Sequence, residues 1–357
     1  MILPSSYLSF SLDSAPKTLY DGAISGNQCQ FVHIPVRIAM EAEHTDKWLT
    51  IKDISSRLQL HPNTVGRYIQ DGRLRGAKVG KSYRVRESDL AAFVGEQAPA
   101  AGARVIVVAN QKGGVGKTTT AVNLSAILAT HFDKRVLLID LDPQAGCALS
   151  IGMDTTHLRK SIYNVLVEPD TDISSVISKT DFGFHLAPSN IDLAGAELEL
   201  KELMAREFRL QRKLAPILGS YDHVIIDTPP TLGLLTINAL SAANFVLIPL
   251  SCQFMALRGL DMLLATVNQV RHNLNPGLRL LTILATNYDS RTLHSREVFD
   301  YLVQTCERQK LPLSNTYIKS SVRFHEAPNE QKPLALLYPE LDGAKAYIEV
   351  AKEVANV

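Results

Sequence analysis

The chain has 357 residues, is 46% hydrophobic and 20% charged, and carries a formal net charge of +1. This composition supports a large packed core, and the length suggests two domains of unequal size. No apolar run reaches the roughly 18 residues that a membrane-spanning helix requires, and no basic stretch precedes an apolar core at the N-terminus, so neither a membrane span nor a signal peptide is expected. Cys29, Cys147, Cys252 and Cys306 are widely spaced and form no C-x-x-C pair. This spacing argues against a zinc or iron–sulfur site and favours reduced cysteines in a cytoplasmic protein.

Residues 1–45 have a weak pattern in which Ser, Pro, Gly and Gln are scattered between short apolar pieces. A disordered leader is the first interpretation of this segment. The second is that translation starts at Met40, which opens a polar stretch ahead of the first patterned unit. The sequence leaves both interpretations open.

Residues 46–94 have the pattern of a compact helix-turn-helix unit. Apolar residues at helical spacing predict a first helix over 52–58, and a second is predicted over 63–70 after a break that contains proline. Two short extended segments follow, over 74–79 and 83–86, and predict a small wing.

This unit closely resembles the excisionase/MerR type of DNA-binding domain. The resemblance is carried by Thr64 and Val65, by Gly72 and Leu74, and by Val79 and Gly80 followed by Arg84. Ten Lys and Arg residues stand against five acids within 46–94, and a local net charge of +5 suits duplex DNA. A basic surface on a protein-binding module is the alternative. The candidates for the groove face are Asn63, Thr64, Arg67 and Tyr68, and those beside the DNA backbone are Arg73, Arg75, Lys78, Lys81 and Arg84.

Residues 95–103 are mostly small and include one proline, which predicts a linker, and 104–357 form the larger domain. In this domain, continuous apolar runs alternate with helical stretches. The alternation predicts an α/β fold with a mostly parallel, doubly wound sheet and helices on both faces. The predicted strands are 105–109, 136–140, 184–188, 223–227, 245–250 and 280–285.

A glycine-rich segment over 110–120 follows the first of these strands and precedes a predicted helix that runs to about Thr130. Strand, glycine-rich turn and helix N-terminus form the setting of a P-loop NTPase, in which backbone N–H groups converge on a phosphate. The predicted nucleotide-binding residues are Lys112, Gly113, Gly114, Val115, Gly116, Lys117, Thr118 and Thr119.

The loop departs from the plain G-x-x-x-x-G-K-[ST] pattern, because Gln111 occupies the first glycine position and an extra lysine, Lys112, opens the loop. Lys117 is predicted to bring positive charge to the outer phosphates, and Thr118 to offer a hydroxyl to Mg²⁺. The variant K-G-G-x-G-K-T resembles the deviant Walker A motif of the ParA/MinD class of ATPases.

Two further motifs place carboxylates at the ends of predicted strands. Asp140 and Asp142 follow the strand over 136–140, and Asp227 ends the strand over 223–227 in the manner of a Walker B motif. A simple turn cap is the alternative for Asp140 and Asp142. The D-T-P-P that begins at Asp227 again resembles ParA proteins. Further matches over 188–197, 247–250, 288–292 and 322–328 extend the resemblance across essentially all of 104–357.

The resemblance implies a DNA-partition ATPase that uses ATP and Mg²⁺ and forms a nucleotide-sandwich homodimer. By match to the family, Lys117 acts within its own subunit, Lys112 reaches the partner's phosphates, and Asp142 orients the attacking water. The residues implied for Mg²⁺ are Thr118, Asp140 and Asp227. The family also implies a ParB-like centromere-binding partner, often acting through a basic N-terminal peptide, that stimulates slow hydrolysis, and a cytoplasmic, nucleoid-associated location in bacteria.

The ATP-bound dimer of this family binds DNA without sequence preference. The matching basic residues here are Arg291 and Arg323, and a surface salt bridge is the alternative role for each. The family commonly has a basic residue shortly before the second arginine, whereas Ser320 and Ser321 stand there in this chain. We therefore expect weaker non-specific binding through this face, compensated by the helix-turn-helix.

Three rival interpretations concern the class of protein. MinD has the same loop and binds membranes through a basic amphipathic C-terminal helix, but the tail over 343–357 mixes Lys with Glu and predicts a final helix packed on the sheet, with no membrane partner. Nitrogenase-type iron proteins are excluded by the lack of paired cluster cysteines. A sequence-specific transcriptional regulator that uses ATP as a conformational switch stays open as the alternative function, with the helix-turn-helix reading an operator.

Overall fold

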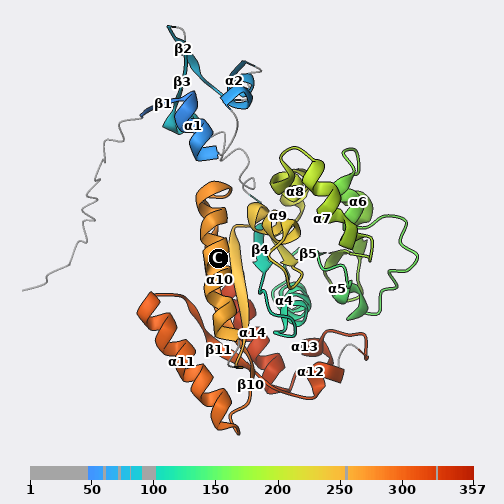
Figure 1. Ribbon diagram of the computed structural model, residues 1–357. Coiled ribbons are helices and arrows are strands. Elements are labelled where there is room, and N and C mark those ends of the chain that lie inside the picture. The colour runs from blue at the N-terminus through green and yellow to red at the C-terminus, as the bar shows by residue number, and fades with distance from the viewer. Residues whose placement is uncertain are drawn as a thin grey trace, which may run out of the picture. The chain divides into compact units, whose positions relative to one another are not determined.

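The computed structural model describes residues 47–58, 62–70, 74–80, 82–90, 102–253, 256–326 and 329–357. The leader expected over 1–45 lies outside these ranges, as do most of the linker expected over 95–103 and two of the predicted DNA contacts, Arg73 and Lys81. The described residues form a small N-terminal part and a larger α/β part, each of which is considered by itself (Figure 1).

The small part is a helix-turn-helix with a wing, as the sequence predicts. Its helices are α1 (Ile51–Leu58) and α2 (Pro62–Gln70), and its antiparallel sheet has the order β1 (Trp48–Thr50), β3 (Ser82–Arg86) and β2 (Ala77–Val79). Strand β1 was not predicted, because three residues are too few to show a period. The core of the part consists of Leu49, Ile54, Val65, Ile69, Leu74, Val85 and Leu90.

Local chemistry fixes the ends of these elements. Asp53 accepts the backbone N–H of Thr50 at 2.8 Å, and Thr50 Oγ1 accepts the N–H of Asp53 at 3.1 Å, so the two residues cap α1 reciprocally. Hydrogen bonding to Thr50 lowers the pKa of Asp53. Gly80, at a φ of +63°, supplies the left-handed backbone that the turn of the wing requires.

The large part is built on a single sheet. Within 102–357 as described, its strand order is β11-β10-β9-β4-β8-β5-β7-β6, and every neighbouring pair is parallel except β6 with β7. The strands are β4 (Arg104–Val108), β5 (Val136–Asp140), β6 (Ser178–Lys179), β7 (His185–Ala187), β8 (His223–Asp227), β9 (Phe245–Ser251), β10 (Arg279–Tyr288) and β11 (Leu313–Lys319).

All six predicted strands are confirmed with small changes at their ends, and β10 extends three residues beyond its predicted end at 285. The two edge strands were not predicted. Strand β11 mixes polar and apolar residues because, among the described residues, one of its edges has no neighbouring strand, and β6 has only two residues.

Helices cover both faces of this sheet, which confirms the doubly wound prediction (Figure 1). Successive residues of β4 alternate between two cores: Val105 and Val107 enter one, and Ile106 and Val108 the other. The first core is covered by α6 (Ile162–Val167), α7 (Leu193–Glu202), α8 (Arg209–Leu214), α9 (Leu234–Ala242), α10 (Ala256–Asn273) and α11 (Leu293–Gln309). The second is covered by α4 (Lys117–His131), α5 (Gly146–Leu149), α13 (Leu334–Leu337) and α14 (Asp342–Ala355).

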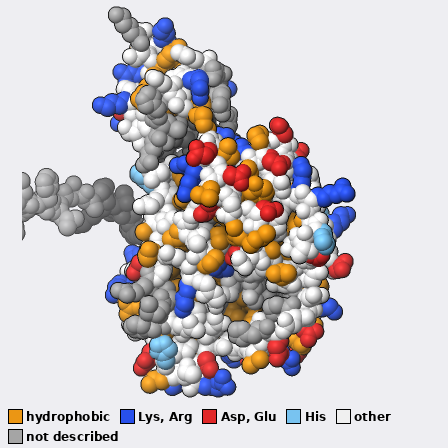
Figure 2. Space-filling model, turned by 45° about the vertical axis from the view of Figure 1, so that its right-hand side comes forward, with side chains coloured by type: hydrophobic (Ala, Val, Ile, Leu, Met, Phe, Trp, Pro, Cys, Tyr) orange, Lys and Arg blue, Asp and Glu red, His pale blue; other side chains and the backbone are white. Residues whose placement is uncertain are grey.

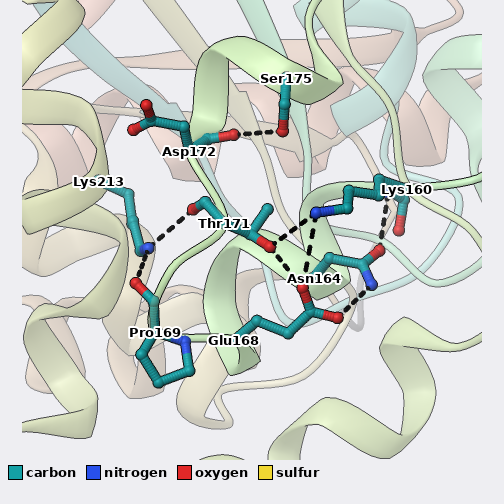
Figure 3. A network of polar contacts seen from close by, with 9 residues as sticks. Lys160, Asn164, Glu168, Pro169, Thr171, Asp172, Ser175 and Lys213 are labelled. Carbon is teal, nitrogen blue, oxygen red and sulfur yellow. Dashed lines mark hydrogen bonds and ion pairs between the residues drawn. The ribbon is translucent and has the colours of Figure 1, made fainter.

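Short helical turns complete the fold. They are η1 (Ile173–Val176), η2 (Arg206–Phe208), η3 (Ala215–Ser220) and α12 (Arg323–Glu326). A polar network fixes the segment between α6 and η1 (Figure 3): Lys213 Nζ donates to the carbonyls of Pro169 and Thr171 at 2.6 and 2.7 Å. Glu168 accepts hydrogen bonds from Asn164 and Thr171 in the same network. The network therefore joins α8 to the loop that leaves α6.

The last helix, α14, packs against the sheet as predicted. Its residues Tyr347, Val350 and Val354 are buried in the second core, beside α4 and β11. None of the helices in the described part of the chain is both long enough and apolar enough to cross a bilayer.

Candidate nucleotide-binding site

The glycine-rich loop lies between the end of β4 and the start of α4. Gly114 and Gly116 have φ values of +71° and +86°, in the left-handed region that glycine adopts without strain. Gly116 is the N-cap of α4, so the loop delivers the chain directly to a helix N-terminus. This is the backbone arrangement that binds an anion.

Hydrogen bonds between the loop and the neighbouring strands hold the loop in this shape. Asn110 is buried, donates to the carbonyl of Pro249 at 2.7 Å and accepts the N–H of Lys112 at 3.0 Å. Thr286 Oγ1 donates to the carbonyl of Val115 at 2.9 Å, and Asn287 Nδ2 donates to that of Gly114 at 3.2 Å. Thr286 and Asn287 were not predicted from the sequence, and Asn110 was named only as the first residue of the glycine-rich segment. The available signal was their position at the carboxyl ends of parallel strands, where ligands bind: Asn110 follows β4, and Thr286 and Asn287 lie in the last three residues of β10.

The predicted metal ligands converge beside the loop. Thr118 Oγ1 donates to Asp227 Oδ2 at 2.6 Å. Asp140, from the adjacent strand, is fully buried and accepts the backbone N–H groups of Asp142 at 2.9 Å and Cys147 at 3.0 Å. Burial raises the pKa values of Asp140 and Asp227 above their usual range. Thr118, Asp140 and Asp227 thus lie together although they come from three elements.

The residues present fit a divalent cation. Asp227 Oδ1 is buried and, within the described residues, has no hydrogen-bond partner. A buried carboxylate oxygen without a partner is energetically costly, and a cation would satisfy it. Hydroxyl and carboxylate oxygens are the ligands that Mg²⁺ prefers. The three predicted residues therefore suit Mg²⁺ held together with phosphate oxygens.

The two lysines of the loop lie in different environments. Lys117 is buried, at 7% exposure, and its Nζ donates to the carbonyl of Lys112 at 3.2 Å, inside its own loop. Burial lowers the pKa of Lys117, and the charges of Asp227 and Asp142 oppose this shift. Lys112 instead extends away from the loop, and its Nζ donates to Gln253 Oε1 at 2.9 Å. Gln253, beyond the end of β9, is a further residue that the sequence analysis missed.

Asp142 follows β5 and is partly exposed at the edge of the site. Its Oδ1 accepts the backbone N–H of Gln144 at 3.0 Å, so the side chain also makes the turn contact that was its alternative role. The segment after this turn approaches the P-loop helix closely. If Gly146 had a Cβ atom, that atom would lie only 3.1 Å from Thr118 Cγ2.

The first turns of α4 are tied to the C-terminal part of the fold. Asn123 donates to the carbonyl of Thr119 at 2.7 Å and accepts the N–H of Ala335 at 2.7 Å. Thr120 Oγ1 and the hydroxyl of Tyr347 lie 3.1 Å apart and form a buried hydrogen bond. The helix that carries Lys117 and Thr118 is therefore anchored to α13 and α14.

The predicted DNA contacts of the small part lie mostly on the outside of α2. Asn63 and Arg67 are exposed and Thr64 is partly exposed, whereas Tyr68 packs against the core of the part. Arg75 is exposed just before β2, and Lys78 is exposed on β2. Arg84 is partly exposed on β3. Helix α2 thus presents polar groups opposite its buried Val65 and Ile69.

Arg291 and Arg323 lie at the end of the sheet beyond β10 and β11, and both already hold acidic partners. Arg291 donates to both carboxylate oxygens of Asp289 at 2.9 Å, and these hydrogen bonds lower the pKa of Asp289 to about 2. Arg323 donates to Glu326 at 3.0 Å. A cavity of about 330 Å³ lies beside Arg291 and is lined by Tyr288, Asp289, Ser290, Arg291, Lys319, Ser320, Ser321 and Val322. DNA phosphates would have to compete with these ion pairs.

Comparison with known proteins places the two parts in known families. A family model described as an AAA domain matches residues 103–280, and one described as a helix-turn-helix domain matches residues 48–98. The sporulation initiation inhibitor protein Soj of Bacillus subtilis is 44% identical over 253 residues, which cover 71% of this chain and 98% of Soj. The chromosome partitioning protein ParA of Myxococcus xanthus is 40% identical over 261 residues, which cover 73% of this chain and 90% of that protein.

A solved structure from Mycobacterium smegmatis, described as cobyrinic acid a,c-diamide synthase with bound ADP and magnesium, is 43% identical and has a TM-score of 0.61. The match covers 70% of this chain and 93% of that chain. A parallel sheet with a P-loop and with carboxylates at the ends of the neighbouring strands defines a P-loop ATPase that works with ATP and Mg²⁺. Within this class, the chain belongs to the ParA family of partition ATPases and carries a helix-turn-helix domain in addition.

Proposed function

We propose that this protein drives the segregation of a plasmid or a chromosome as an ATP-switched DNA-binding dimer. In this proposal, the ATP-bound form dimerises around the nucleotide and associates with nucleoid DNA without sequence preference, and a ParB-like partner stimulates slow hydrolysis. The domain limits are those of the sequence analysis: 46–94 for DNA binding, 95–103 as the linker and 104–357 for the ATPase. The observation that carries the proposal is the convergence of Lys117, Thr118, Asp140 and Asp227 at one edge of the sheet.

The chain's own residues account for the chemistry. Lys117 leaves the carbonyl of Lys112 and binds the outer phosphates, where its charge stabilises the transition state. Asp142, at the rim, orients the attacking water. Asp140 keeps Asp142 in place by accepting its N–H. Thr118, Asp140 and Asp227 would hold Mg²⁺, which would neutralise charge on the phosphates.

The position of Lys112 supports the proposed dimer. Its ammonium group is held by Gln253, outside its own loop. It is therefore positioned to reach the phosphates bound by a second subunit. Apolar side chains that a second copy would cover are also exposed near this edge. Leu149 ends α5 beside the P-loop helix and is 56% exposed, and Ile191, which follows β7, is 68% exposed. Figure 2 shows apolar side chains exposed among charged ones on a face of the molecule.

Two surfaces support DNA binding. The helix-turn-helix has the exposed polar face of α2 and a local charge of +5 over 46–94. The far end of the ATPase sheet has Arg291 and Arg323, whose acidic partners oppose phosphate binding. We therefore propose that the ATPase face binds DNA weakly until dimerisation doubles the number of its contacts.

The test is DNA binding with ATP, ADP or no nucleotide, on random DNA and on DNA from upstream of its own gene. The proteins are the wild type, Lys117→Ala, and Arg67→Ala as a variant confined to the small domain. Binding to random DNA that requires ATP and is lost in Lys117→Ala supports segregation. Binding to random DNA that is equal in all three nucleotide states contradicts it.

A site-specific transcriptional regulator is the second candidate, because the helix-turn-helix has a core of its own and a polar recognition face. It predicts a footprint on one short upstream site that survives without nucleotide and in Lys117→Ala but is lost in Arg67→Ala. This result would reclassify the protein as a regulator that uses ATP as a conformational switch.

A further inference from the structure

A thiol shares the pocket of the two buried carboxylates and has no part in the proposed hydrolysis. Cys147, in α5, is fully buried, and its Sγ lies 3.5 Å from Asp227 Oδ2. Its backbone N–H donates to Asp140 Oδ2 at 3.0 Å. One ligand atom from each of Asp140, Cys147 and Asp227 lies within 4.8 Å of the other two. A sulfur and two carboxylate oxygens therefore converge on one buried point.

The unpartnered oxygen of Asp227, which Mg²⁺ would also satisfy, is a second sign that a cation binds beside these three groups. Thr118 and Cys147 both contact Oδ2 of Asp227, while Oδ1 is buried with no hydrogen-bond partner among the described residues. Two carboxylates alone suit a hard cation such as Mg²⁺. The addition of a thiolate changes the preference of the site, because sulfur ligands favour softer cations such as Zn²⁺.

We propose that Asp140, Cys147 and Asp227 form a binding site for a thiophilic divalent cation such as Zn²⁺, which competes with Mg²⁺ for the two carboxylates. On binding, the Cys147 thiol releases its proton to solvent and the sulfur bonds to the metal. Bond lengths of about 2.0–2.3 Å in a tetrahedral zinc site separate the ligand atoms by roughly 3.3–3.8 Å. The Cys147 Sγ and Asp227 Oδ2 atoms, 3.5 Å apart, already lie in this range, and a water molecule or the Thr118 hydroxyl would take the fourth position.

The consequence for activity rests on the proposed roles of Asp140 and Asp227 in hydrolysis, whereas the metal site itself does not. A cation held by Asp140 and Asp227 blocks their use by Mg²⁺, so Zn²⁺ inhibits hydrolysis until it is removed. The spacing of the cysteines gave no signal for this site, because the other two ligands are aspartates from different strands.

The first measurement uses the full-length, nucleotide-free protein after treatment with a chelator. Cd²⁺ is added as a spectroscopic substitute for Zn²⁺, because its thiolate complexes absorb in the ultraviolet. We compare the wild type with Cys147→Ala, with Cys147→Ser, and with Cys252→Ala as the matched control, since Cys252 is also a free, buried cysteine. We expect one equivalent of thiolate-bound Cd²⁺ in the wild type and Cys252→Ala, and its loss in both Cys147 variants.

Competition with a chromogenic chelator then gives the Zn²⁺ affinity. Loss of an outer-shell partner weakens metal binding by about 10–100-fold, so loss of a direct ligand is expected to exceed about 100-fold in both Cys147 variants. Equal Zn²⁺ affinities in the wild type and a folded Cys147→Ser variant would overturn the proposal.

Mg²⁺-dependent ATP hydrolysis is measured separately in Cys252→Ala. A Cys147-dependent Cd²⁺ signal without hydrolysis would keep the metal site and reject the proposed hydrolysis mechanism. Hydrolysis without that signal would keep the mechanism and reject the metal site.

Discussion

The hydroxyl of Thr286 is expected to control the shape of the P-loop from a distant strand. It donates to the carbonyl of Val115 at 2.9 Å, and Thr286 is 2% exposed. Thr286→Val removes this hydrogen bond but keeps a β-branched side chain of the same shape, which suits a strand. The lost bond contributes about 0.5–1.5 kcal/mol, and the buried Val115 carbonyl left without its donor raises the loss to about 1–3 kcal/mol.

Two measurements follow from this magnitude. The unfolding midpoint should fall by about 2–4 °C for each kcal/mol lost in a domain of this size, as measured by calorimetry. If the whole of this loss weakens binding, the affinity for a non-hydrolysable ATP analogue should fall by about 5- to 150-fold, since 1.4 kcal/mol corresponds to a factor of ten. Isothermal titration with Mg²⁺ present measures this affinity.

Thr282→Val is the matched control, because Thr282 is also buried in β10, at 3% exposure, and its hydroxyl makes a long 3.5 Å contact with the carbonyl of the next residue. We expect it to change nucleotide affinity by less than about twofold, because a contact of this length contributes little. If Thr286→Val and Thr282→Val have the same nucleotide affinity, the reasoning about the loop is wrong.

Three further predictions concern other parts of the ATPase domain. Gln253→Ala frees the ammonium group of Lys112 by removing a hydrogen bond that contributes about 1 kcal/mol. We therefore expect ATP-dependent dimerisation, measured by light scattering, at an ATP concentration that is a few-fold lower. An unchanged concentration would mean that Gln253 does not restrain this lysine. Burial lowers the pKa of His223 below its usual 6.5, so the unfolded chain takes up a proton first as the pH falls. The contribution of His223 to stability is therefore complete above about pH 6.5 and is lost at lower pH. His223→Gln should make the unfolding midpoint fall less steeply between about pH 7 and 5 than it does in the wild type. Parallel curves of unfolding midpoint against pH for the two proteins would refute this. Tyr347→Phe removes the hydrogen bond to Thr120 and should lower stability by about 0.5–1.5 kcal/mol in denaturant unfolding, without a change in the slope of the transition; no loss would show that this bond does not help to anchor α4.

Structural features that depend on residues close together in the chain could be predicted from the sequence itself. The sheet strands of the ATPase domain could be located because continuous apolar runs are needed to bury both faces of a parallel sheet. The turn after β4 could be predicted to bind phosphate because its glycines occur within a few residues of a helix start. In the structure, Gly114 and Gly116 adopt left-handed backbone. The helix-turn-helix was likewise predictable from the spacing of apolar residues along α1 and α2.

The tertiary structure alone decided which side chains complete the site. Gln253 lies 141 residues along the chain from the Lys112 that it binds, and Thr286 lies 171 residues from Val115. Cys147 lies just outside the motif that contains Asp140 and Asp142, and its approach to Asp227 depends on the pairing of β5 with β8. Local sequence patterns record the propensity and periodicity of adjacent residues. Contacts between distant residues are set by strand order and register, which arise only when the whole sheet packs between its two layers of helices.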